Sequence, residues 1–366
     1  MNDKHHGTGH IPDRAAFADV RRAIDRLRRG DPVALDVNGR RNVIFAIETM
    51  DAAGLALARG LAPGGLKIAI TALRATALGL EPIPGEPTEF DLPKTAGLEW
   101  LRSFADPTSL AGRSGLTNGS APDAGVTAAA LTLAKLAGLM PAVVVGAVYG
   151  RASEVPAVSA AHALRFAEES ARWLNRVAEA RVPLADAENA TIIAFRPYDG
   201  GAEHLAIVVG ELDTTQPVLV RIHSACFTGD LIGSLRCDCG DQLRGALQAM
   251  AERGSGVVVY LPQEGRGIGL VNKLRAYALQ DGGLDTIDAN LHLGFAPDER
   301  TYAAAGEILR QLGVTRVRLL TNNPEKIDAL ARLGCEIVER VPHVFAANPH
   351  NEAYLRTKAR RAGHNI

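Results

Sequence analysis

The sequence predicts an α/β fold with mixed sheets, divided into two domains. Strand-like runs alternate with helical patterns along most of the chain, which is typical of layered α/β structures. The chain has 366 residues, about the length of two average domains. The pattern of helix and strand signals changes after Pro197–Ala202, a Gly-containing segment that we interpret as a linker. We therefore expect one domain over residues 13–200 and a second over residues 203–366.

Periodicity in the first domain favours alternating helices and strands. The helices are expected at residues 19–29, 126–138 and 158–180, and the strands at residues 32–37, 42–47 and 142–148. Polar segments rich in Gly and Pro, residues 81–95 and 112–125, are expected to be loops. Residues 1–12 are expected to form a flexible tail; its His5, His6 and His10 could contact a metal, but the tail is the simpler interpretation.

The second domain shows the same alternation with clearer boundaries. Strands are expected at residues 205–209, 217–222, 256–261 and 317–321, and helices at residues 242–253, 268–280 and 299–312. A further helix should begin at Asn322-Asn323-Pro324 and end at Gly334, because a capping residue, a first-turn proline and a closing glycine stand in their preferred places. The sequence contains no internal repeat and no low-complexity tract.

Composition and charge exclude several classes of function. The formal net charge is -1, so the chain lacks an overall positive field for nucleic acid, and any phosphate site must depend on a local cluster. Apolar runs such as Met140–Val148 are too short to span a bilayer. The polar N-terminus lacks a signal-peptide core, and the few cysteines suit a reducing compartment. We expect a cytoplasmic protein with neither nucleic acid nor membrane as a partner.

Three of the four cysteines, Cys226, Cys237 and Cys239, lie within one short segment. Structural zinc takes four protein ligands, whereas catalytic zinc takes three and leaves one position for water. The alternatives are buried apolar packing, which is common for free cysteine, or a disulfide that would leave one thiol over. Two cysteines separated by one residue rarely arise for packing alone, so a metal site is favoured. Cys335 follows Gly334 between a helix and a strand, and we expect it to fill the core.

A glycine-rich segment, Glu264–Gly269, follows the strand that ends at Leu261 and precedes a helix. Its glycines allow close approach of the backbone, the helix N-terminus offers N–H donors to a phosphate, and Arg266 adds a planar cation. Taken alone, the segment could equally be an ordinary turn. It is not a Walker A loop, because the Gly-Lys-Ser/Thr ending is absent.

Three other features are ambiguous on local sequence. Asp298-Glu-Arg300 begins a helical pattern, where an N-capping aspartate is the usual interpretation. Residues 321–326 follow a strand, a common place for ligands in α/β sheets but also an ordinary connection. Tyr277 lies within a helix, where aromatic core packing is the default.

Together the motifs of the second half form one ordered series. They are Arg221-Ile-His-Ser-Ala-Cys226, Ser234-Leu-Arg-Cys-Asp-Cys-Gly240, Gln263-Glu-Gly-Arg-Gly-Ile-Gly269, Asp298-Glu-Arg300, Leu319-Leu-Thr-Asn-Asn-Pro324 and Val338-Glu-Arg-Val-Pro342. The run from Arg221 to His364 closely resembles GTP cyclohydrolase II, a hydrolase that acts on cyclic amidine C–N bonds and opens riboflavin biosynthesis. The resemblance implies a homodimer that converts GTP to 2,5-diamino-6-(5-phosphoribosylamino)pyrimidin-4(3H)-one, formate and diphosphate.

The resemblance also implies roles for individual residues. One zinc ion per chain would be held by Cys226, Cys237 and Cys239 and would activate water for attack on C8 of guanine. Tyr277 matches a tyrosine associated with release of formate. Asp298 and Arg300 match the family's proton acceptor and its nucleophile at the α-phosphorus, although a permanently protonated guanidinium is better suited to stabilising a phosphoryl transition state. Magnesium is expected to bridge the phosphates.

The GTP contacts implied by the resemblance are spread over several motifs. They map to Arg221, Ile222, His223, Ser224, Ala225, Gln242, Glu264, Gly265, Arg266, Thr286, Thr321 and Lys326. The sequence departs from the family at Ala225, where many relatives have glutamate, so any contact from that carboxylate is lost. We do not expect the change to abolish activity, because the metal and phosphate residues are retained.

The first half faintly resembles 3,4-dihydroxy-2-butanone 4-phosphate synthase, through residues 37–50 and 125–141. The working synthase has an acidic segment that here is Asn38–Val43, without a carboxylate, and a Gly-His-Thr-Glu-Ala segment that here is Gly125-Val-Thr-Ala-Ala129. Without carboxylates nothing can hold the metal or move a proton from carbon. The sequence predicts a retained fold with lost chemistry, which leaves a scaffold, a dimerisation module or a regulatory pocket as its role.

Three alternatives to this interpretation remain at this point. The chain could catalyse both riboflavin reactions, although the missing acidic residues disfavour this. It could be a silent regulatory protein that binds zinc or nucleotide, although the retained Asp298, Arg300 and Tyr277 disfavour that. It could also form an altered product that belongs to another pathway.

Overall fold

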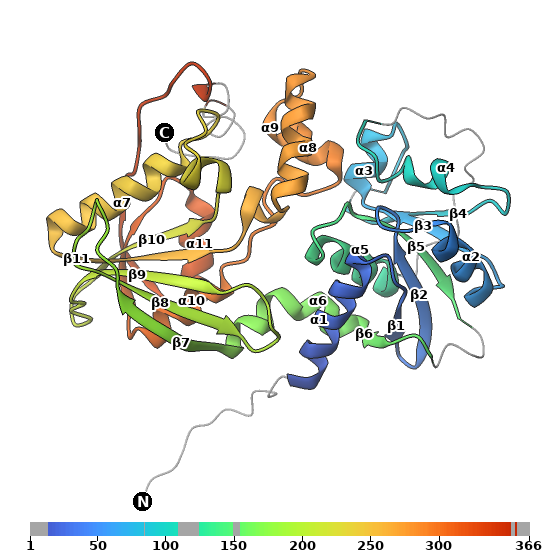
Figure 1. The fold of residues 1–366 in the computed structure, drawn as a ribbon, viewed down its shortest axis with the longest axis horizontal. Coiled ribbons are helices and arrows are strands. Elements are labelled where there is room, and N and C mark those ends of the chain that lie inside the picture. The colour runs from blue at the N-terminus through green and yellow to red at the C-terminus, as the bar shows by residue number, and fades with distance from the viewer. Residues whose placement is uncertain (1–13, 84, 109–123, 149–153, 353–355, 357–366) are drawn as a thin grey trace, which may run out of the picture.

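The computed structural model of the chain describes residues 14–83, 85–108, 124–148, 154–352 and 356. The expected tail at residues 1–12 and nearly all of the expected loop at residues 112–125 lie outside these ranges. Figure 1 shows two lobes, each with its own sheet and flanking helices, as the α/β prediction requires. None of the described helices is both long and apolar enough to cross a membrane.

The N-terminal lobe contains a six-stranded sheet with the order β4-β3-β5-β2-β1-β6, in which only the β1–β6 pair is parallel. Its strands are β1 (Val33–Val37), β2 (Arg40–Ala46), β3 (Lys67–Ile70), β4 (Thr88–Asp91), β5 (Ala142–Ala147) and β6 (Ala157–Ser159). Its helices are α1 (Arg14–Arg28), α2 (Ala52–Leu61), α3 (Ala72–Ala77), α4 (Leu98–Arg102), α5 (Ala124–Leu136) and α6 (Ala160–Glu169).

Alternating side chains place the two faces of this sheet in two different cores. Helices α1, α5 and α6 cover one face, where Leu35 and Ile44 are buried. Helices α2, α3 and α4 cover the other, where Val43 and Phe45 are buried. Strands β1 and β2 form a hairpin whose turn residues, Asn38 and Gly39, both have positive φ, as a two-residue Asn-Gly turn requires.

The C-terminal lobe contains a seven-stranded sheet with the order β13-β12-β10-β11-β9-β8-β7. Neighbours from β13 to β11 are parallel, and those from β11 to β7 are antiparallel. Its strands are β7 (Leu174–Arg181), β8 (Ala190–Pro197), β9 (His204–Gly210), β10 (Val218–Ser224), β11 (Ser255–Leu261), β12 (Arg316–Leu320) and β13 (Glu336–Val341). Its helices are α7 (Cys239–Arg253), α8 (Leu270–Asp281), α9 (Thr286–Leu293), α10 (Ala303–Gln311) and α11 (Pro324–Arg332).

The expected helix at residues 158–180 and the expected domain boundary are both corrected. Helix α6 ends at Glu169, a 3-10 turn (Ser170–Trp173) follows, and β7 and β8 then join the C-terminal sheet. The boundary between the lobes therefore lies near Leu174, and Tyr198–Glu203 merely connects β8 to β9. Strand β7 is an edge strand with almost all of its side chains exposed, so its sequence lacks the apolar alternation by which strands are recognised.

Helix α10 begins at Ala303, not at residue 299, and its N-cap is Tyr302. The helix expected after Asn322 is confirmed: Asn323 caps α11 by accepting a hydrogen bond from the Glu325 N–H, and Pro324 is its first residue. Cys335 is buried in the core between the sheet and α10, as expected.

Helices α8 and α9 extend from the C-terminal lobe to the N-terminal one, as Figure 1 shows. Ala276 of α8, Leu293 of α9 and Phe295 are buried in the same apolar cluster as Phe45 of the N-terminal sheet. The two lobes therefore share a core at this junction.

Candidate active site

The strands β10, β11 and β12 run parallel and end side by side. Three of the sequence motifs follow these ends: Cys226 comes after β10, Glu264 after β11 and Thr321 after β12. Ligands in open α/β sheets bind at the carboxyl ends of parallel strands, where loops from neighbouring strands converge. The fold thus gathers motifs that are about a hundred residues apart in the sequence.

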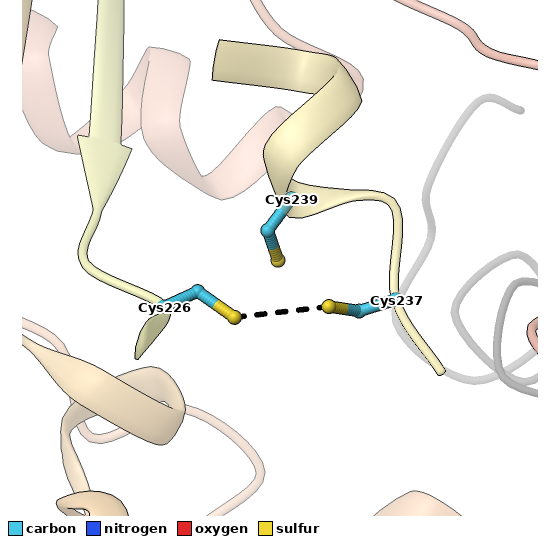
Figure 2. A group of neighbouring side chains, drawn as sticks. All are labelled: Cys226, Cys237 and Cys239. Carbon is cyan, nitrogen blue, oxygen red and sulfur yellow. Dashed lines mark hydrogen bonds between the residues drawn. The ribbon is translucent and has the colours of Figure 1, made fainter. Parts of the chain in front are cut away.

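The three neighbouring cysteines form one cluster, which Figure 2 shows. Cys226 lies beyond β10, while Cys237 and Cys239 flank the start of α7. The three sulfurs lie within 4.8 Å of one another, and those of Cys226 and Cys237 are 3.7 Å apart. A Cβ at Gly229 would lie 2.8 Å from the Cys237 sulfur, so only glycine leaves room for the cluster.

The spacing fits a metal and excludes a disulfide. A disulfide requires sulfurs about 2.05 Å apart. Two sulfurs bound to one tetrahedral zinc at about 2.3 Å lie about 3.8 Å apart, close to the observed spacing. No fourth His, Cys, Asp or Glu joins the cluster in the described part of the chain. Three protein ligands are the number found in catalytic zinc sites.

Lys273 of α8 lies against this cluster. Its ammonium donates to the sulfur of Cys226 at 3.1 Å, to Oγ1 of Thr228 at 2.8 Å and to Oε1 of Glu264 at 2.9 Å. Hydrogen bonds from Cys237 and Cys239, and then the charge of Lys273, lower the pKa of the Cys226 thiol. Burial would lower the pKa of Lys273, but Glu264, Tyr277 and Cys226 raise it above its usual value. The cluster therefore contains a fixed cation that favours thiolate.

Asp230 organises the loop that carries Cys226. It accepts hydrogen bonds from the Cys226 N–H at 2.9 Å and the Tyr260 hydroxyl at 3.0 Å, and its Oδ1 lies 3.1 Å from Nε2 of His223. Burial lowers the pKa of His223, an effect that its hydrogen bond to Asp230 opposes. The imidazole also stacks on the ring of Tyr260, with centroids 5.5 Å apart.

The segment after β11 forms a tight left-handed loop. Gly265 and Arg266 both have φ near +60°, a conformation that is uncommon for a non-glycine residue such as arginine. Glu264 accepts hydrogen bonds from the Phe227 N–H at 2.6 Å and from Lys273, so it ties this loop to the cysteine loop. Gly267 is pressed against the backbone of Glu299, where a Cβ would lie 2.8 Å from the carbonyl.

Asp298 and Arg300 form an ion pair with each other. The Asp298 carboxylate accepts hydrogen bonds from the backbone N–H of Arg300 at 3.0 Å and from its guanidinium Nε at 2.8 Å, with a further contact from Nη2. Burial would raise the pKa of Asp298, but these contacts lower it overall. Since Tyr302 caps α10, the expectation that Asp298 is an N-cap is wrong, and its carboxylate instead orients Arg300.

Two buried cations complete the pocket. Arg221 donates from Nη1 to the Leu320 carbonyl at 3.0 Å, and Lys326 donates to the Ile222 carbonyl at 2.8 Å. Burial lowers the pKa of Arg221 to about 10, so it stays protonated at neutral pH. With Arg266 and Arg300 they supply the local positive charge that the chain as a whole lacks.

A pocket with about 790 Å³ of space, part of it open to solvent, lies over these groups. The predicted residues that line it are Arg221, His223, Ser224, Ala225, Cys226, Cys237, Cys239, Gln242, Glu264, Gly265, Arg266, Tyr277, Arg300, Thr321 and Lys326. Ile222, Thr286 and Asp298 do not line it: the Ile222 side chain is in the core, Thr286 begins α9, and Asp298 lies behind the wall against Arg300. Tyr277 is half-buried at the pocket wall, so its expected core role is corrected.

Sequence reasoning missed three residues of the pocket wall, namely Lys273, Asn322 and Asn323. Asn322 and Asn323 belong to a quoted motif and Lys273 to an expected helix, but nothing local shows which side chains point inward. Several polar atoms at the wall also lack a hydrogen-bond partner among the described residues, including Arg221 Nε, His223 Nδ1 and Ser224 Oγ. Buried polar atoms without partners are costly, so their concentration here indicates a ligand site.

Known proteins resemble this chain in both halves. The family described as GTP cyclohydrolase II matches residues 175–342. A GTP cyclohydrolase-2 of Azospirillum brasilense is 48% identical over 96% of this chain and 95% of its own length. A GTP cyclohydrolase-2 of Cronobacter sakazakii is 52% identical but matches only 52% of this chain with 96% of its own length.

Among solved structures, RibBX of A. baumannii, a two-domain 3,4-dihydroxy-2-butanone 4-phosphate synthase, is similar to this chain at 16% identity. The similarity covers 89% of this chain and 99% of that chain, with a TM-score of 0.34. A likeness of this size carries no information on chemistry.

Proposed function

The chain belongs to the GTP cyclohydrolase II family and is an enzyme of that type, and from this premise we propose how its residues act on GTP. We infer that the pocket hydrolyses GTP to 2,5-diamino-6-(5-phosphoribosylamino)pyrimidin-4(3H)-one, formate and diphosphate, the first step of riboflavin biosynthesis. The observation that carries the proposal is the cysteine cluster beside a pocket lined by five cations, Arg221, Arg266, Lys273, Arg300 and Lys326. Such a pocket suits a purine triphosphate whose ring is placed near a metal.

Cys226, Cys237 and Cys239 would hold one zinc ion. When bound, zinc would supply the Lewis acidity that makes water nucleophilic at neutral pH. Three thiolates give the ion a net negative surrounding, which weakens that acidity. The Lys273 ammonium at 3.1 Å from the Cys226 sulfur offsets part of this charge, so we assign it a supporting role in the ring-opening step.

Tyr277 would act at the formyl group released from the opened ring. Its ring lies at the pocket wall, 5.7 Å from Lys273 Nζ and 4.9 Å from the guanidinium of Arg236. These cations hold the aromatic ring in place, and its hydroxyl can orient or protonate the departing group.

Arg300 would stabilise charge on the α-phosphate, and Asp298 would orient the guanidinium of Arg300. The two-point contact fixes the plane of the guanidinium, and a carboxylate whose pKa is lowered is a weak base. This arrangement favours a stabilising Arg300 over a nucleophilic one. Arg221, Arg266 and Lys326 would bind the remaining phosphate oxygens, and Mg²⁺ would enter with the nucleotide and offset part of its negative charge.

The direct test is an assay of zinc-loaded protein with GTP and Mg²⁺. We expect formate and the diaminopyrimidine to appear in equal amounts, identified by mass. Absence of both from a preparation with full zinc content would refute the proposal. Nucleotide binding without turnover would favour the silent regulatory protein, and a different product mass would indicate another pathway.

We propose that the N-terminal lobe no longer catalyses the synthase reaction. Its Asn38–Val43 hairpin has no carboxylate, and the buried Glu89 of β4 is paired with Lys67 at 2.9 Å and with the hydroxyl of Thr127. We expect no product when the protein is incubated with ribulose 5-phosphate and Mg²⁺. Formation of dihydroxybutanone phosphate would instead establish a bifunctional enzyme.

We further propose that the protein is cytoplasmic and forms a homodimer. Sedimentation of the purified protein would test the oligomeric state.

A further inference from the structure

The loop that carries Asp298 and Arg300 is held from the N-terminal lobe. It joins the end of α9 at Leu293 to the start of α10 at Ala303. At its beginning, the Gly294 carbonyl accepts a hydrogen bond from Thr71 Oγ1 at 2.9 Å, and Phe295 is buried in the core shared by the lobes.

The second anchor of the loop is an ion pair between Lys135 of α5 and Glu299. The Lys135 ammonium lies 2.6 Å from Glu299 Oε1, and both side chains are mostly buried. The same oxygen accepts the Ala296 N–H at 2.7 Å, and the Glu299 N–H donates to the Arg266 carbonyl at 3.0 Å. Glu299 therefore ties the loop to itself and to the Arg266 segment, and Lys135 fixes the position of Glu299.

Helix α8, which carries Lys273 and Tyr277, is held in a similar way. Glu48 accepts a hydrogen bond from Arg275 at 2.8 Å, and its second oxygen accepts the Met140 N–H at 2.7 Å. Arg275 donates to Asn272 at 2.8 Å, and the fully buried Asn272 donates to the Gly138 carbonyl at 2.9 Å.

Two catalytic segments thus depend on polar contacts from a lobe none of whose described residues line the pocket. We propose that the N-terminal lobe is a positioning module for the cyclohydrolase site, with Lys135 and Glu48 as positioning residues for Arg300 and Tyr277 respectively. The proposal rests on the proposed function, because positioning has meaning only if these segments act on GTP. Among the possible roles of the lobe, namely scaffold, dimerisation module or regulatory pocket, the proposal selects a scaffold that positions catalytic residues.

The apolar packing between the lobes does not by itself require the polar contacts of Lys135 and Glu48. The shared apolar core would join the lobes without any ion pair, whereas Lys135 acts on the residue between Asp298 and Arg300. A shift of about 1 Å in a catalytic group can cost on the order of a hundredfold in rate, so a single contact at this position matters. Arg221, Arg266 and Lys326 would still line the pocket and bind GTP in the ground state.

The test compares full-length Lys135→Met with Lys135→Arg and with Lys67→Met. Lys67 is the matched control, because it forms a 2.9 Å ion pair with Glu89 within the N-terminal lobe and at similar exposure. We expect Lys135→Met to lower kcat about tenfold or more, with KM for GTP nearly unchanged, because a group lost from the transition state alone lowers kcat and kcat/KM equally. Lys135→Arg should restore most of the rate, and Lys67→Met should leave it unchanged.

Hydrogen exchange supplies a readout that does not depend on turnover. We expect the amides of residues 295–300 to exchange faster in Lys135→Met than in the wild type or in Lys67→Met, while the zinc content of all variants is equal. Unchanged kcat and unchanged exchange in Lys135→Met would overturn the proposal, as would an equal loss of rate in Lys67→Met. If the wild type releases no formate, the proposed function fails, and faster exchange in Lys135→Met would still support the coupling while unchanged exchange would overturn it.

Discussion

A buried arginine in each lobe shows a different pattern of hydrogen bonding. In the N-terminal lobe, Arg74 is fully buried and donates to the carbonyls of Phe104, His292 and Asp106 at 2.8–3.0 Å. In the C-terminal lobe, Arg221 Nε and His223 Nδ1 have no partner among the described residues, and both side chains line the pocket.

The difference separates a structural use of polar groups from a functional one. A buried polar atom destabilises the fold unless it is hydrogen-bonded, so unpaired atoms at a pocket wall are available to bind a ligand. Both lobes are α/β, and their sheets are similar in size. The fold class therefore says little about chemistry. Unpaired buried atoms also occur at Arg21, Thr88 and Trp173 of the N-terminal lobe, so they do not by themselves mark a site.

The largest expected effect follows from removal of a zinc ligand. Cys237→Ala leaves two of the three sulfurs, so the ion should be lost and ring opening should fall by on the order of a thousandfold or more. Elemental analysis and formate release measure both consequences. The matched control is Cys335→Ala, because that thiol is buried in the core away from the cluster. Full formate release by the Cys237 variant would contradict the zinc assignment.

Arg300→Ala should reduce turnover roughly a hundredfold to a thousandfold, the usual cost of removing one charged donor from a transition state. Zinc content should remain that of the wild type, because Arg300 is not one of the proposed zinc ligands and is paired with Asp298. Arg310→Ala removes an exposed arginine paired with Glu307 and should leave turnover unchanged. Wild-type turnover in Arg300→Ala would remove this residue from the mechanism.

Lys273→Met sharpens the comparison between the lobes, because Lys67→Met removes an ion-paired lysine of the N-terminal lobe. Loss of the ammonium beside Cys226 should lower zinc affinity or turnover by about 10- to 100-fold, as is usual for groups that contact metal ligands. Lys67→Met should change neither. Zinc competition with a chelator and the formate assay measure the two effects, and equal behaviour of the two variants would show that Lys273 has only a structural role.

Much of the fold and most of the pocket could be predicted from the sequence. The apolar residues of β10, β11 and β12 made their type evident, whereas the motifs at the ends of β11 and β12 were ambiguous until the family resemblance joined them. Strand β7 was missed, because an exposed edge strand has no apolar pattern, and the domain boundary was misplaced as a consequence.

The missed site residues share a different cause. The contact of Lys273 with Cys226 joins residues 47 positions apart, and that of Lys135 with Glu299 joins residues 164 apart. Such pairs are set by tertiary packing, within the C-terminal lobe for the first and between the lobes for the second, which no local pattern encodes. Thr286 was assigned to the pocket by resemblance alone, and the structure places it at the start of α9, outside the pocket wall.

The smallest expected effect is a pH dependence of stability from the C-terminal lobe. His343 is buried, its Nε2 lies 2.7 Å from the Gln242 carbonyl, and burial, together with the charge of Arg221, lowers its pKa from 6.5 to about 4. Between these two values the unfolded chain binds a proton that the folded chain does not, so stability falls as the pH falls from about 6.5 to about 4.

At pH 5 this loss should reach about 2 kcal/mol relative to pH 7, since each pKa unit corresponds to about 1.4 kcal/mol. His343→Gln keeps an amide donor for the Gln242 carbonyl but cannot titrate, so its free energy of unfolding should fall less between the two pH values. Urea unfolding of both proteins at pH 7 and pH 5 gives the difference. Equal pH dependence in the two proteins would mean that acid acts elsewhere, and that the burial of this histidine in the C-terminal lobe has little cost.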